Sequence, residues 1–182
     1  VLAWALIRTF VDDNADLIRT RDQALIETAD VVVDVGGLHD PDALRFDHHQ
    51  QEYTGPLSSA GMVLRWLEDS ERVSKPLAAL LRVQLVDYVD DVDNGRRMPD
   101  AGVPCFAKLV DAYNQGCHTL AEFDAGFRRA GEAAIGLVAG LATGHAERLA
   151  SAATVVAAMN DAAEAGRNVI FMERYHSWKD IY

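Results

Sequence analysis

A run of valines, VVVDV at residues 31–35, constrains the fold of this chain more than any other feature, and it ends abruptly at Gly36 and Gly37. A short, continuous, β-branched run bounded by glycines is typical of a central strand that is buried on both faces of a parallel sheet. A second short strand is expected over residues 44–49. Strands alternate with helical patterns in the first 70 residues, and this alternation predicts an α/β fold with a mostly parallel sheet.

Apolar residues at helical spacing predict the remaining elements. Helices are expected over residues 1–10, 22–29, 58–70, 76–92 and most of the Ala-rich stretch 105–165. Asp22 is expected to cap the second of these helices, and Ser58-Ser59 to start the third. Breaks in that stretch are expected near Gly116–Thr119 and Thr143–Gly144, and Gly166 is placed to end it. Residues 168–174, NVIFMER, predict a last strand.

Composition bounds the class of protein. Of the 182 residues, 49% are apolar, which argues against disorder, and no stretch approaches the roughly 20 apolar residues of a membrane-spanning helix. The formal charge of −11 argues against a broad basic face for duplex nucleic acid, although a small anionic substrate could bind through metal ions. Two cysteines without ligand spacing and a first segment without a charged leader lead us to expect a cytoplasmic protein.

Asp34 is the first candidate for chemistry, because a carboxylate near the end of a buried strand is costly unless it is paired or binds metal. A cap of the following turn explains it equally well. Asp47, His48 and His49 form the second cluster. Neutral imidazole is a common metal ligand, and a neighbouring carboxylate can orient it. Along a strand His48 would face away from Asp47 and His49, unless the strand has already ended. Adjacent histidines can also be a surface accident.

A third cluster is acidic, since Asp87, Asp90, Asp91 and Asp93 crowd one predicted helix end. Like charges at this spacing disfavour one another unless a cation is present. A solvated helix end is the alternative, although acidic residues are better placed at the start of a helix than at its end. Asn94-Gly95 is a natural terminator, which would leave Asp93 at the lip of a cleft.

The segments VVVDVGG, RFDHHQ, SSAG and VDDVDNG occur in this order, and together they resemble the DHH phosphoesterase superfamily. They are most similar to its branch named after melanocyte proliferating gene one. The resemblance implies a Rossmann-like, mostly parallel sheet of the DHH type in residues 1–100. A helical extension with a final strand would follow in 101–182 and pack with the first part as one unit.

The resemblance also implies a two-metal site for phosphoester hydrolysis, with two divalent ions, Mn²⁺ or else Mg²⁺. Asp34 would bridge the ions, His48 would bind one, and Asp93 or else Asp90 would supply a further ligand. His49 would contact the scissile phosphate and Asp47 would orient the histidines. Two residues at a helix start could bind the substrate phosphate: Ser58 and Ser59.

Two departures from the branch concern the ends of the sequence. An HxDD or HxDE motif precedes the first helix in that branch, and this sequence begins just after that position, so part of the metal site is expected to lie outside the 182 residues. From the resemblance we also expect the branch's usual carboxyl-terminal portion to lie outside the 182 residues.

Three functions remain open. The preferred one is an exonuclease or phosphodiesterase that acts on short single-stranded RNA or oligonucleotides. The first alternative is a phosphoesterase for a small molecule such as pyrophosphate or a cyclic dinucleotide. The second alternative is a non-catalytic binding module that retains the fold, with Ala-rich helices that could pair two copies of the chain.

Overall fold

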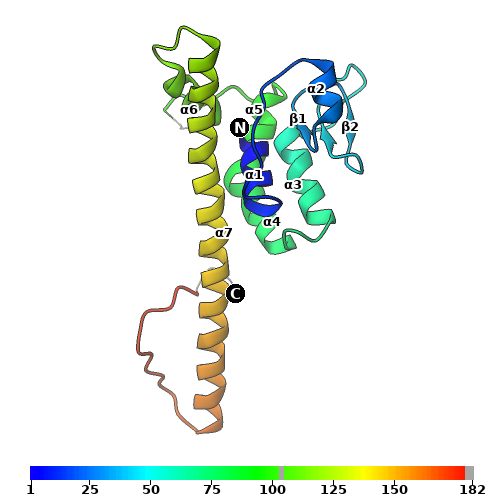
Figure 1. The fold of residues 1–182 in the computed structure, drawn as a ribbon. Coiled ribbons are helices and arrows are strands. Elements are labelled where there is room, and N and C mark those ends of the chain that lie inside the picture. Colours follow the sequence, from blue (N-terminus) through cyan, green and yellow to red (C-terminus); the bar gives the residue numbers. More distant parts are fainter. Residues whose placement is uncertain (103–104, 179–182) are drawn as a thin grey trace. The chain divides into compact units, whose positions relative to one another are not determined.

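A computed structural model describes residues 1–102 and 105–178 (Figure 1). The chain forms two compact units, Val1–Val138 and Ala139–Tyr182. The sequence resemblance places a different boundary at residue 100, between a metal-binding part and a helical extension. That boundary stays a prediction. The elements are α1 (Leu2–Phe10), α2 (Gln23–Thr28), β1 (Val32–Val33), β2 (His39–Asp40), β3 (Arg45–Phe46), α3 (Ser59–Asp69), α4 (Lys75–Leu81), η1 (Arg82–Val86), α5 (Asp87–Asp93), α6 (Phe106–Asn114) and α7 (Leu120–Glu164).

The sheet is smaller than the valine run suggests. Its three strands have the order β1-β3-β2, with β1 parallel and β2 antiparallel to β3. Within the described residues β1 is therefore an edge strand and β3 the central one, so the prediction that residues 31–35 form the central strand was wrong. The run is cut short because Asp34 leaves the extended conformation, with a φ of 65°. Only Val32 of the run is fully buried.

The core of the N-terminal unit lies between α1, α3 and β3. Leu6 of α1, Leu64 of α3 and Phe46 of β3 are completely shielded from solvent. Figure 1 shows α1 packed beside α3. Each such side chain contributes about 1.5–3 kcal/mol by leaving water. This packing brings the ends of β1 and β3 next to the start of α3, where the candidate residues lie.

Local signals for helix starts are confirmed. Asp22 caps α2, because its carboxylate accepts a hydrogen bond from the Ala24 backbone N–H at 2.9 Å. Ser58 is the N-cap residue of α3, as the Ser58-Ser59 pair predicts. The helix expected over residues 76–92 forms, but η1 interrupts it with one π-helical turn. Such turns occur often at functional sites, and this one directly precedes α5.

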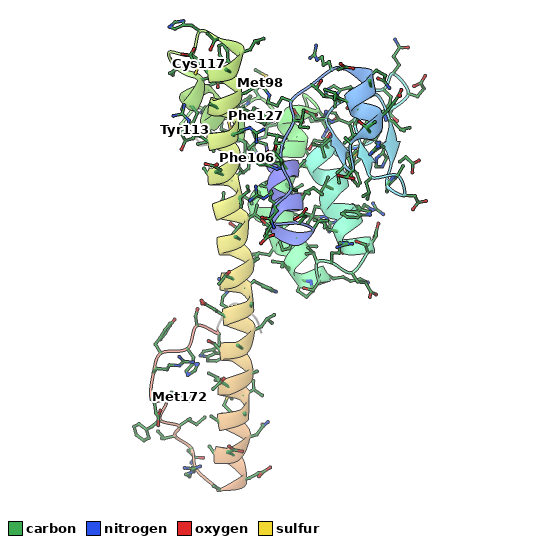
Figure 2. All side chains as sticks on the ribbon, viewed as in Figure 1. Met98, Phe106, Tyr113, Cys117, Phe127 and Met172 are labelled. Atoms are coloured by element: carbon green, nitrogen blue, oxygen red, sulfur yellow. The ribbon has the colours of Figure 1, made fainter. Side chains whose placement is uncertain are left out.

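Helices α6 and α7 follow the expected order, with the break between them at residues 115–119. They pack closely at Gly126 of α7, where an added Cβ would lie 2.9 Å from the Tyr113 carbonyl oxygen. Tyr113, Phe106 and Phe127 are labelled in Figure 2. The break expected near Thr143–Gly144 was wrong, because α7 continues through it. An isolated glycine costs a helix only about 1 kcal/mol, and its alanine-rich neighbours favour the helix.

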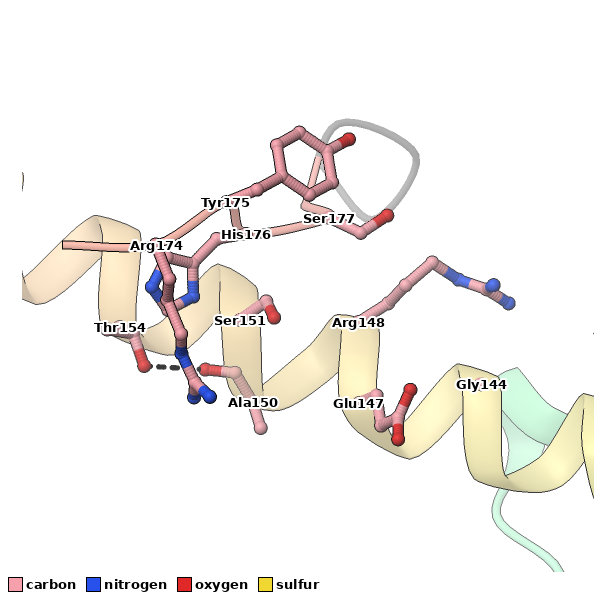
Figure 3. Close-up of a pocket in the computed structure, with 10 residues that line it drawn as sticks. All are labelled: Gly144, Glu147, Arg148, Ala150, Ser151, Thr154, Arg174, Tyr175, His176 and Ser177. Carbon is pink, nitrogen blue, oxygen red and sulfur yellow. Dashed lines mark hydrogen bonds between the residues drawn. The ribbon is translucent and has the colours of Figure 1, made fainter. Parts of the chain in front are cut away.

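The C-terminal unit contains the second half of α7 and the segment after it. Gly166 ends the helix with a φ of 65°, as expected. The strand expected over residues 168–174 was wrong, because no described strand pairs with this segment and Phe171 is 93% exposed. A hollow of about 500 Å³ lies between α7 and the segment 174–177 (Figure 3), and none of the predicted site residues lines it.

No helix in the described part of the chain combines the length and apolar character that crossing a membrane requires.

Candidate metal centre

Asp34 follows β1 directly and adopts an uncommon backbone conformation. Its φ of 65° is left-handed, which few residues other than glycine adopt, and such conformations concentrate at functional sites. Its backbone N–H donates to the Phe46 carbonyl at 3.0 Å, so the residue remains attached to β3. The side chain is 59% exposed. Partial burial in the cleft, and then the negative charge of Asp93, raise the pKa of the Asp34 carboxyl.

Asp47, His48 and His49 follow β3, which ends at Phe46. The strict alternation of a strand therefore does not apply to them. Asp47 and His48 are buried, whereas the His49 side chain is 60% exposed. The two imidazole rings lie 4.2 Å apart, centre to centre, at 89° to one another. The end of the strand thus allows both histidines to approach Asp34.

Asp47 holds this turn together. One carboxylate oxygen accepts a hydrogen bond from the Gly37 N–H at 2.7 Å, and the other lies 2.6 Å from Nδ1 of His49. Burial raises the pKa of Asp47, but the hydrogen bonds from Gly37 and His49 outweigh burial and hold the pKa below its ordinary value. Gly37 has a φ of 65°, so the turn that presents its N–H favours glycine. Asp47 is therefore placed to orient His49, while the orientation of both histidines that the resemblance implies stays a prediction.

The Asp47–His49 pair predicts an elevated histidine pKa. The hydrogen bond from His49 to Asp47 raises the pKa of the imidazole above its ordinary value of 6.5. The stabilisation by the charged pair is then present below pH 6.5 and is lost as the pH rises through the pKa of the folded protein. NMR titration of the metal-free protein in a chelator should give a His49 pKa above 6.5. The Asp47→Asn variant should lower it, and a wild-type value at or below 6.5 would contradict this geometry.

His48 is the centre of the cluster. Its Nε2 lies 3.6 Å from Asp34 Oδ1 and 3.7 Å from Asp93 Oδ2. Nδ1 of His49 lies 3.9 Å from the same Asp34 oxygen. One ligand atom from each of Asp34, His48 and His49 can be chosen so that all lie within 4.8 Å of one another. Residues from three separate chain segments thus converge on one point.

Asp93 and Asp90 lie in different surroundings, although both belong to α5. Asp93 ends the helix, Gly95 turns the chain with a φ of 68°, and Asp93 lines the cleft beside His48, as the terminator predicts. Asp90 is buried and accepts hydrogen bonds from Ser58, at 2.9 Å from its N–H and 2.6 Å from its hydroxyl. Of these two aspartates, the structure brings only Asp93 to His48.

Ser58 and Ser59 also differ. Ser58 is fully buried, and both its hydroxyl and its N–H donate to Asp90 rather than into the cleft. The Ser59 hydroxyl lies 3.4 Å from Asp34 Oδ1, at the edge of the cluster. The Gly61 N–H also donates to Asp90, so this carboxylate receives three donors from the first turn of α3. Burial raises the pKa of Asp90, against the effect of these donors.

The donor set fits a divalent cation. An ion about 2.1 Å from each ligand atom can be shared by atoms up to about 4.2 Å apart, and the separations around His48 Nε2 are 3.6 and 3.7 Å. The negative charge of Asp93 contributes to the raised pKa of Asp34, and a cation bound beside Asp34 would offset this repulsion. Carboxylate together with imidazole suits manganese. Within the described residues, His48 Nδ1 is buried without a hydrogen-bond partner.

Sequence reasoning did not single out Tyr53. Its hydroxyl donates to the Leu57 carbonyl at 2.9 Å and accepts from the Leu57 N–H at 3.1 Å. Its ring lies 6.5 Å from the ring of His48. Tyr53 thus closes the loop between the histidines and Ser58. An aromatic residue four positions after His49 and just before Gly55-Pro56 was the available signal.

The cluster opens into a cleft of about 350 Å³. Asp34, Ser59 and Asp93 line one part of it. Sequence reasoning did not identify the apolar part of the wall that α5, α6 and α7 contribute: Tyr88, Val89, Val92, Phe106, Val110 and Phe127. Val1, Leu2 and Ala3 also line the cleft. Only folding brings these helices to the cluster.

Comparison with known proteins agrees with the motifs. Relatives include the MYG1 protein of Chlamydia trachomatis, 41% identical over 68% of this chain and 44% of the relative. The MYG1 exonucleases of mouse and human are 32% and 30% identical over 71% of this chain. The chain spans less than half the length of these relatives. No solved structure matches it.

A family model also matches the whole chain. This model, MYG1_exonuc, carries the description "Uncharacterised protein family (UPF0160)" and matches residues 1–182. The chain therefore belongs to the MYG1_exonuc family.

Proposed function

We propose that this chain is the metal-binding part of a divalent-metal-dependent phosphoester hydrolase that acts as an exonuclease on short single-stranded RNA. The observation that carries the proposal is the position of His48 Nε2, within 3.7 Å of carboxylates from two other segments. The mouse and human relatives are named exonucleases, and this supports the reaction class. We further propose that the family belongs to the DHH phosphoesterase superfamily and shares its Rossmann-like sheet.

In this proposal different residues bind the metal ions and contact the phosphate. Asp34, His48 and Asp93 would hold two divalent ions, of Mn²⁺ or Mg²⁺. Bound there, the ions supply Lewis-acid polarisation of a phosphoryl oxygen. His49, positioned by Asp47, donates a hydrogen bond to a phosphoryl oxygen from the exposed side of the cluster.

Ser59 and Asp90 have supporting roles. Ser59 presents its hydroxyl at the edge of the cluster, beside Asp34. Asp90 and Ser58 hold the first turn of α3 in place through two buried hydrogen bonds. In this proposal Asp90 and Ser58 therefore shape the site without contacting the ions.

Hydrolysis of a labelled single-stranded RNA of about five nucleotides tests the function. The full-length protein should release mononucleotides with Mn²⁺ and lose this activity when a chelator removes the metal. Restoration by added Mn²⁺ should follow. Bound manganese without cleavage of any phosphoester would contradict the hydrolase and favour a binding module.

The charge of the cleft favours a second candidate, a phosphoesterase for a small molecule. Among the described residues that line the cleft there is no lysine or arginine, and the chain carries a formal charge of −11. A long RNA tracks along basic groups, whereas a small substrate does not need them. Cleavage of pyrophosphate or a cyclic dinucleotide by the same preparation, without cleavage of RNA, would select this candidate.

A further inference from the structure

We propose that the apolar wall of the cleft is a subsite for a nucleobase, with Phe106 as the ring on which the base stacks. We call the wall formed by Tyr88, Val92, Phe106, Val110 and Phe127 the base subsite. The inference rests on the proposed function and narrows its substrate class to phosphoesters that carry a nucleobase next to the reacting phosphate. All five residues belong to the N-terminal unit, as does the metal cluster.

The size of the cleft and the chemistry of its lining suit one nucleotide. Its volume of about 350 Å³ lies at the lower end of the range of about 300–1,000 Å³ for small-molecule sites. Asp34 and Asp93 line the same cleft as the base subsite. A ligand that reaches both needs a charged group at the metal cluster and an apolar, planar group against the wall. A nucleotide has both.

The charges of the lining strengthen this choice. The charged side chains among the described residues of the cleft are Asp34, Asp93 and Asp111, all acidic, so without metal ions the cleft repels a phosphate and offers it no ion pair. Binding energy beyond that from the metal ions must therefore come from uncharged contacts. Stacking of a base on an aromatic ring is such a contact, and it works with every base because each has a π-face.

Of the three aromatic residues in the wall, Phe106 is the one whose ring contacts no other ring or cation among the described residues. The Tyr88 hydroxyl accepts a hydrogen bond from the Asp100 N–H, and the Arg97 guanidinium lies 4.8 Å from its ring centre. Phe127 has the Arg19 guanidinium 4.5 Å from its ring centre.

Phe106 makes no ring contact within the described part of the chain and is only half-buried at the start of α6. Figure 2 labels it together with Phe127. The two rings belong to different helices that line the same cleft. Phe106 thus offers an aromatic surface in the cleft that Asp34 and Asp93 of the metal cluster also line.

Binding of adenosine 5′-monophosphate and of ribose 5-phosphate by the full-length protein, measured by calorimetry with Mn²⁺, tests the subsite. The two probes share the phosphate and the sugar and differ in the base. Adenosine 5′-monophosphate should bind at least about 5-fold more tightly, since stacking contributes about 5- to 150-fold per base. Phe106→Ala should remove most of this difference and leave the affinity for ribose 5-phosphate unchanged.

Phe106→Trp should keep the preference for the nucleotide, which a role in folding alone would not explain. Phe123→Ala is the matched control, because Phe123 is 37% exposed on α7 and does not line the cleft. Equal affinity of wild type for the two probes, binding of neither probe, or an unchanged ratio in Phe106→Ala would overturn the subsite. Base preference without any hydrolysis of RNA would contradict the exonuclease and still support the subsite.

Discussion

Replacing His48 with alanine is expected to abolish metal-dependent hydrolysis. The variant removes a buried nitrogen that lies within 3.7 Å of both Asp34 and Asp93. Loss of a residue that only supports a ligand typically lowers metal affinity or activity by about 10- to 100-fold, so loss of a ligand should cost more than about 100-fold. Calorimetric titration with Mn²⁺ and hydrolysis of short RNA measure the two effects separately.

The control for this variant is another histidine. His118 is exposed and precedes α7, apart from the cluster, so His118→Ala should leave metal binding and hydrolysis unchanged. His48→Gln, which retains a polar side chain of similar size, separates loss of the ligand from loss of folding. Hydrolysis by a folded His48→Ala protein at the wild-type rate would show that His48 is not a metal ligand in the proposed site.

Replacing Asp90 with alanine is expected to cause the largest loss of stability. The change leaves the Ser58 hydroxyl and N–H without their acceptor in a buried position, and it removes the acceptor of the Gly61 N–H. Each orphaned buried donor costs about 1–3 kcal/mol, so the free energy of unfolding should fall by about 3 kcal/mol or more. Urea denaturation of the metal-free protein measures it without any contribution from bound ions.

The neighbouring aspartate provides the control. Asp91 is partly exposed and pairs with Arg96, so Asp91→Ala should lower the free energy of unfolding by less than about 1 kcal/mol. A similar loss in the two variants would show that Asp90 does not hold α3. Gly61→Ala offers a second check, because a Cβ there would collide with the Asp90 carboxylate.

Signals within a few residues of one another predicted local structure well. Asp22 and Ser58 mark the starts of α2 and α3, while Gly95 and Gly166 end helices with positive φ values. These outcomes depend on backbone sterics and on hydrogen bonds between near neighbours, which a short sequence encodes. The helix break predicted at Gly144 does not occur, because the helix propensity of the surrounding alanines outweighs the cost of one glycine.

Strands were predicted less well, because a strand needs a partner elsewhere in the chain. Residues 31–35 and 168–174 both have the composition of strands. The first contributes only Val32 and Val33 to the sheet, and the second pairs with no strand among the described residues. Neither outcome can be read from residues near the segment itself.

In the candidate site, too, local sequence and tertiary packing determine different features. The sequence by itself determined the donors, because aspartate and histidine are chemically suited to a cation, and the terminator Asn94-Gly95 placed Asp93 at a helix end. Only the tertiary structure decided which donors meet. Asp90 and Asp93 lie within one turn of α5, yet the packing of α3 against α5 buries Asp90 under Ser58 and leaves Asp93 beside His48. The sequence of α5 has aspartates on more than one side and so does not by itself specify which of them meets a neighbouring helix, a choice that the packed core makes.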